Sequence, residues 1–85
     1  VDIVIKFKNG LLGLFDPKTI ESDPENVAKH NALIEYIEEL NKQGKKAVGS
    51  IIINNKGSWR YCNMRIENDK DLDYWEFLNL AKLNS

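Results

Sequence analysis

The stretch from Ala47 to Ile66, AVGSIIINNKGSWRYCNMRI, predicts a β-hairpin with apolar or aromatic side chains on both faces. Successive side chains of a strand point to opposite faces of a sheet, and a small protein needs only one apolar face for its own core. The second apolar face therefore indicates a surface that contacts a partner.

The turn of this hairpin sets how its strands pair. The turn sequence NNKG, residues 54–57, suits a type I turn closed by a glycine in a left-handed bulge. This turn predicts pairing of Ile53 with Trp59 and of Ile51 with Tyr61. A two-residue turn would shift these partners without changing the alternation within each strand.

The predicted hairpin has a contact face and a core face. The candidate contact face carries Ile51, Ile53, Trp59, Tyr61 and Arg65. The face expected to join the core carries Val48, Ser50, Ile52, Arg60, Cys62, Met64 and Ile66. Because both faces are apolar enough to be buried, the inverse assignment stays open, and the solvent exposure of Trp59 decides between them.

An earlier hairpin is predicted from residues 1–15. The segment VDIVIKFK alternates with a period of two, and Asn9-Gly10 follows it, which is the strongest short signal for a two-residue type I′ turn. Such a turn pairs Phe7 with Leu12 and Ile5 with Leu14. We expect one core face that carries Ile3, Ile5, Phe7, Leu12 and Leu14.

Two helices are expected. The first runs from about Pro24 to Gln43, capped by Asp23 and closed by Gly44. Its apolar stripe consists of Val27, His30, Leu33, Ile34, Ile37 and Leu40. The second runs from about Leu72 to Leu83, and its apolar residues cover more of its circumference than a one-sided surface helix requires.

These elements predict one α+β domain over residues 1–85. Its architecture is a two-layer ββαββα sandwich, with a four-stranded antiparallel sheet and both helices on one face. The other face of the sheet would be open to solvent, and one side of the second hairpin would lie on it.

Composition limits the classes of function. The 85 residues carry 12 Lys or Arg and 13 Asp or Glu, so a net charge of −1 gives no overall attraction to phosphate backbones. No apolar run is longer than three residues, the length of Ile51 to Ile53, which is far too short to cross a membrane. Cys62 is the only cysteine, which favours a reducing compartment, and we expect a cytoplasmic protein. A cleaved leader before Val1 would leave no trace in this sequence.

Metal and cofactor sites are not predicted. Asp69, Asp71 and Asp73 have the spacing of the first ligands of a calcium loop, but Tyr74 and Leu80 stand where that loop needs glycine and glutamate. Capping of the second helix explains these aspartates better. One His and one Cys cannot supply a four-ligand zinc site.

Catalysis is the least supported class. His30 and Cys62 could in principle form a nucleophile and base, but both are expected at packed positions. The sequence contains no phosphate-binding loop, dinucleotide fingerprint or nucleophile elbow. We therefore expect a protein that is not an enzyme.

The remaining indication is a binding surface. Trp, Tyr and Arg anchor protein interfaces, so we expect a small protein-binding or regulatory module whose partner is another protein or a second copy of the chain. One alternative is a single-stranded nucleic-acid-binding module that uses Lys56, Trp59, Arg60, Tyr61 and Arg65. Another is an accessory domain of a larger protein.

Overall fold

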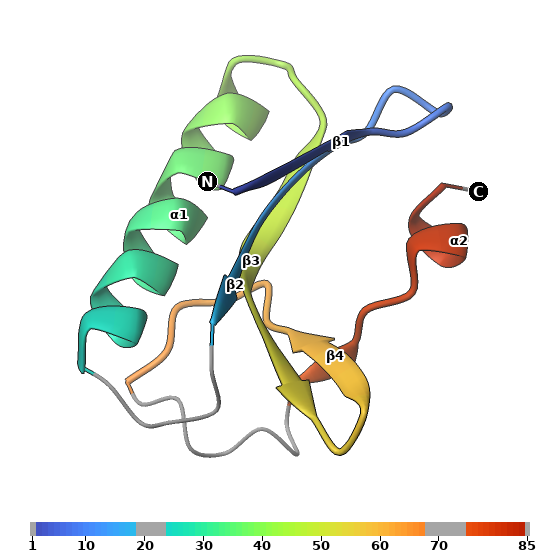
Figure 1. Ribbon diagram of the computed structural model, residues 1–85. Helices are drawn as coiled ribbons and strands as arrows, with labels where there is room; N and C mark the ends of the chain where they lie inside the picture. The colour runs from blue at the N-terminus through green and yellow to red at the C-terminus, as the bar shows by residue number, and fades with distance from the viewer. Residues whose placement is uncertain (1, 19–23, 68–74, 85) are drawn as a thin grey trace.

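The computed structural model describes residues 2–18, 24–67 and 75–84 and has an α+β fold (Figure 1). Its elements are β1 (Ile3–Lys6), β2 (Leu12–Lys18), α1 (Pro24–Lys42), β3 (Ala47–Asn55), β4 (Ser58–Tyr61), β5 (Glu76–Phe77) and α2 (Leu80–Leu83). Within these ranges the strands form one five-stranded sheet in the order β1-β2-β3-β4-β5.

The sheet is mixed, so the prediction of four antiparallel strands is wrong in this detail. β2 and β3 run parallel, while β1 with β2, β3 with β4, and β4 with β5 run antiparallel. The reason is α1, which leads the chain back along the sheet, so that β3 starts at the same end as β2. The fold contains a β-α-β crossover between two hairpins.

The first helix agrees with its prediction. It ends at Lys42, and Gly44 takes a φ of 86° while Lys45 N donates to the Leu40 carbonyl at 3.1 Å, as in a Schellman closure. Five residues of the predicted stripe are buried: His30, Leu33, Ile34, Ile37 and Leu40. Val27 is half-buried, and the predicted cap Asp23 lies outside the described residues.

The turn between β1 and β2 differs from the predicted type I′ turn. Gly10 N donates to the Phe7 carbonyl at 3.1 Å, Phe7 N donates to the Leu11 carbonyl at 2.9 Å, and Gly10 has a φ of 88°. This is a type I turn with a glycine bulge, and it pairs Ile5 with Gly13 instead of Leu14.

Packing over Gly13 explains this register. A Cβ at position 13 would lie 2.9 Å from the ring of Phe15 and 3.0 Å from the ring of Phe7, so the missing side chain makes room for both rings. Ile3 and Ile5 therefore share a face with Gly13 and Phe15. The predicted single face that joined them to Leu12 and Leu14 is wrong, since Leu12 and Leu14 pack toward α1.

The turn between β3 and β4 is a two-residue turn. Lys56 and Gly57 have φ values of 55° and 83°, and Ile52 pairs with Tyr61. The predicted bulge and the pairing of Ile53 with Trp59 are therefore wrong by one residue. The observed register puts Arg60 opposite Ile53 on the α1 side of the sheet, and it puts Trp59 on the other side.

The central strand β3 is buried on both faces. Ile51 and Ile53 are fully buried and cluster with Trp75, and Cys62 and Ile66 pack against this cluster. On the opposite face, Phe15, Ser50 and Ile52 are also buried, so that face is not simply open to solvent. Met64, which was expected in the core, is exposed.

The predicted helix over residues 72–83 is wrong in the part that the structure describes. Glu76 and Phe77 form β5, and only Leu80–Leu83 is helical, capped by the Asn79 side chain, which accepts from Lys82 N at 3.1 Å. This segment pairs with β4 and then reaches the β1–β2 turn, where Lys8 N donates to Asn84 Oδ1 at 2.8 Å. Figure 1 shows α1 on one side of the sheet and α2 on the other, not both on one face.

The close approach of β2 and β3 can be tested at Gly49. An added Cβ there would clash with the Leu14 carbonyl oxygen and lie 2.9 Å from its carbon, and neither atom can move without moving the strand. We expect Gly49→Ala to lower the free energy of unfolding by about 3 kcal/mol, at the upper end of overpacking costs. Gly13→Ala should cost less because it meets only ring edges. Equal urea midpoints for Gly49→Ala and wild type would contradict this packing.

Candidate binding surface

Three large apolar side chains are exposed together at the β4–β5 edge of the sheet. Trp59 is 41% exposed, Phe77 61% and Leu80 44%. They surround an open hollow of about 430 Å³, completed by Ser58, Leu78 and Asn79. We call Trp59, Phe77 and Leu80 the aromatic edge surface.

Backbone pairing brings this surface together from two distant parts of the chain. Phe77 pairs with Arg60 across β4 and β5, and Leu78 N donates to the Trp59 carbonyl at 2.9 Å. Asn79 then starts α2, which places Leu80 beside the hollow. The surface therefore depends on the C-terminal segment staying attached to β4.

Arg60 attaches that segment. Its Nη1 donates to the Trp75 carbonyl at 2.9 Å, and its guanidinium carbon lies 3.8 Å from the centre of the Phe77 ring. Its Nε is buried and, among the described residues, has no hydrogen-bond partner. Arg60 and Phe77 therefore lie together on the α1 face of the sheet edge, whereas Trp59 lies on the opposite face.

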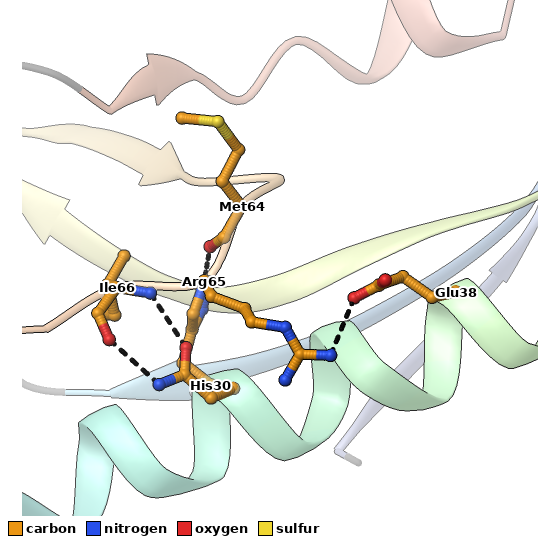
Figure 2. Close-up of polar contacts among 6 residues, drawn as sticks. His30, Glu38, Met64, Arg65 and Ile66 are labelled. Atoms are coloured by element: carbon orange, nitrogen blue, oxygen red, sulfur yellow. Dashed lines mark hydrogen bonds and ion pairs between the residues drawn. The ribbon is translucent and has the colours of Figure 1, made fainter.

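Trp75 is anchored to α1 by His30. Trp75 is buried, and its ring centre lies 5.4 Å from that of His30. His30 is fully buried, and its Nε2 donates to the Met64 carbonyl at 2.7 Å (Figure 2). Burial lowers the pKa of His30 from its ordinary value of 6.5, because the imidazolium would lose its hydration, and the bond to Met64 opposes this shift.

The segment after β4 is fastened to the same helix. Asn31 bonds both backbone groups of Ile66: its Nδ2 donates to the carbonyl at 2.9 Å, and its Oδ1 accepts from the amide at 2.8 Å. Arg65 forms an ion pair with Glu38 at 3.1 Å, and both side chains are about half exposed (Figure 2). These contacts hold residues 64–66 against α1.

Tyr61 lies on the same face as Trp59, next to a second hollow of about 550 Å³. Burial raises the pKa of Tyr61, and a hydrogen bond to the Glu76 carboxylate together with its negative charge raises it further. The phenol therefore stays protonated and acts as a donor to Glu76. Phe77, Asn79, Lys82 and Leu83 also line this hollow.

The predicted contact face is only partly assembled. Trp59 and Tyr61 lie together on the face away from α1, whereas Ile51 and Ile53 are fully buried beneath α1 and Trp75. Arg65 is paired on α1 instead of joining Trp59. The grouping of the two isoleucines and Arg65 with the aromatic pair is thus wrong, because the strand register shifts by one residue.

The predicted nucleic-acid set is also divided. Lys56 is exposed in the β3–β4 turn near Trp59, but Arg60 points to the α1 side and Arg65 is bound to Glu38. The five residues do not form one surface. No finding tests nucleic-acid binding itself, which stays a prediction.

Phe77 and Leu80 were missed as surface residues because the sequence assigned them to a helix. The available signal was the breadth of the apolar stripe over residues 72–83, which exceeds what one side of a helix can bury. In the described part of this segment, Trp75 is buried, whereas Phe77 and Leu80 are exposed at the edge of the sheet.

His30 and Cys62 do not form a nucleophile and base. The Cys62 thiol donates to the Met64 carbonyl at 3.5 Å, and His30 donates to the same oxygen. Two donors on one acceptor do not activate each other. Among residues 2–18, 24–67 and 75–84, no three His, Cys, Asp or Glu side chains could together hold a metal ion.

Comparison with known proteins does not identify a family for this chain. No protein-family model matches the chain, and no curated protein or solved structure matches it. In the described part of the chain, no helix is both long and apolar enough to cross a membrane.

The buried His30 predicts a pH dependence of stability. Its pKa is lower in the folded than in the unfolded chain, so the unfolded chain binds the proton first as the pH falls below about 6.5. We expect the free energy of unfolding to fall in that range, by at most about 1.4 kcal/mol per pH unit. His30→Gln, which keeps a donor for the Met64 carbonyl but does not titrate, should lack this loss. Parallel urea-denaturation profiles of the two proteins between pH 7 and 5.5 would contradict the assignment.

Proposed function

We propose that this protein is a small non-enzymatic protein-binding module, and that its aromatic edge surface docks an apolar segment of a partner protein. The observation that carries the proposal is the exposure of Trp59, Phe77 and Leu80 around one hollow. Solvent exposure of three such side chains at one place is unfavourable unless another surface covers them.

The residue types favour a protein partner. Trp is enriched at the energetic centres of protein interfaces, and aromatic side chains lose little conformational entropy on binding. Phe77 is already held by Arg60, so part of the ordering cost is met before the partner arrives. Both arginines make internal contacts, which leaves the surface poor in the guanidinium groups that phosphate recognition uses.

The backbone beside the surface supports an extended partner segment. β5 is the last strand in the sheet order, so an extended chain can align along its outer edge. β5 has only two residues, which limits how much main-chain pairing it can offer. Side chains that enter the hollow would therefore supply most of the affinity.

Selection of random dodecapeptides on the purified protein tests the proposal. We expect enriched peptides to be rich in apolar and aromatic residues and to bind Trp59→Ala and Phe77→Ala at least about tenfold more weakly than wild type. Tyr36→Ala is the matched control, since Tyr36 is an aromatic residue exposed on α1 away from the hollow, and it should bind as wild type does.

Two outcomes bear on the partner. Sedimentation that shows a concentration-dependent dimer, abolished by Trp59→Ala, would identify a second copy as the molecule docked on this surface. Peptides that bind wild type and Trp59→Ala equally, or no enrichment at all from a monomeric protein, would refute the proposal.

A further inference from the structure

A second candidate site lies at the opposite end of α1 from His30. A hollow of about 640 Å³ is lined by the β1–β2 turn and by the connection from α1 to β3. Its lining residues are Lys6, Phe7, Asn9, Gly10, Leu11, Leu12, Gly44, Lys45 and Lys46. We call it the lysine groove.

The charged side chains among the lining residues of this groove are all positive. Three of its lining residues are lysines and none is acidic, and none of the three takes part in an ion pair among the described residues. Lys8 and Lys42 are exposed on the same turn and helix end, so this end carries five of the 12 basic residues of a chain whose net charge is −1.

The end of α1 accounts for only part of this charge. A helix C-terminus carries roughly half a negative charge, and lysines near it are stabilising. One lysine is enough to offset that half charge, and three line the groove. A net positive potential therefore remains for an anionic ligand.

The walls of the groove are apolar, and its backbone is accessible. Phe7 is buried, and Leu11 and Leu12 are half-buried. Gly10 and Gly44 both have positive φ, and a Cβ at either position would have no atom within 4 Å. The two glycine turns thus leave open space around their main chains, and a ligand can approach closely.

We propose that the lysine groove binds an acidic peptide segment of a partner protein, with carboxylates on Lys6, Lys45 and Lys46 and an apolar side chain against Leu11 and Leu12. The groove presents neither an arginine nor an exposed ring on which a base could stack, which favours a peptide over a nucleic acid. This inference rests on the proposed function, protein binding, but uses a different surface, so the two can fail separately.

The test uses a fluorescein-labelled hexapeptide, Asp-Leu-Glu-Leu-Asp-Phe, and its neutral counterpart Asn-Leu-Gln-Leu-Asn-Phe. We expect the acidic peptide to bind at low salt, to weaken as salt rises, and to shift the amide resonances of Gly10 and Gly44. A Lys45→Gln/Lys46→Gln variant should bind it at least about tenfold more weakly. Trp59→Ala should bind it as wild type does, because it alters only the aromatic edge surface.

Lys29→Gln/Lys56→Gln is the matched control, because it removes two exposed lysines that neither line the groove nor lie at its positive end of the molecule. Equal losses in the two double variants would show general charge attraction and overturn the proposal. Equal binding of the neutral peptide, shifts confined to residues outside the groove, or no binding at low salt would also overturn it. Full displacement of the peptide by a short oligothymidylate at equal concentration would point to a nucleic acid and would equally refute a peptide site.

Discussion

Burial of β3 on both faces determines what each of the other elements has to cover. Ile51 and Ile53 on one face and Ser50 and Ile52 on the other are buried. Transfer of each isoleucine out of water stabilises the fold by roughly 1.5–3 kcal/mol. α1 covers much of the first face, and Trp75 completes it. The remaining C-terminal residues then turn over the edge of the sheet, where β5 pairs with β4.

The binding surface follows from this arrangement. Arg60 can bond the Trp75 carbonyl only because the strand register turns it toward α1, and the same register turns Trp59 away. Phe77 pairs with Arg60 and packs against its guanidinium on the α1 face, whereas Trp59 lies on the other face, so the two rings border the hollow from opposite faces of the sheet edge. The contact that anchors the C-terminal segment and the exposure of the aromatic edge surface therefore have one cause.

Patterns that depend on neighbouring residues were predictable from the sequence. The length of α1, its stripe and its closure at Gly44 follow from local spacing, and the expectation that Trp59 is exposed also held. The turn types of the two hairpins were predicted the wrong way round: the turn at Asn9-Gly10 has the bulge, and the turn at Lys56-Gly57 has two residues. Packing of the Phe7 and Phe15 rings over Gly13 and the contacts of Arg60 favour these turns, and both involve residues far from the turn itself. The observed pairing of β3 with β4 differs by one residue from the predicted pairing, and therefore Ile51 and Ile53 lie in the core instead of beside Trp59. The exposure of Phe77 and Leu80 was not predicted, because their spacing fits a helix, whereas Phe77 lies in β5.

One strand register buries Trp75 and exposes Trp59. Acrylamide quenching of fluorescence measures this directly when each tryptophan is left alone, in Trp75→Phe and in Trp59→Phe. With Trp59 at 41% exposure and Trp75 at 5%, we expect strong quenching of Trp59 and weak quenching of Trp75. A Trp59 as protected as Trp75, in variants that remain folded by circular dichroism, would contradict both the register and the surface built on it.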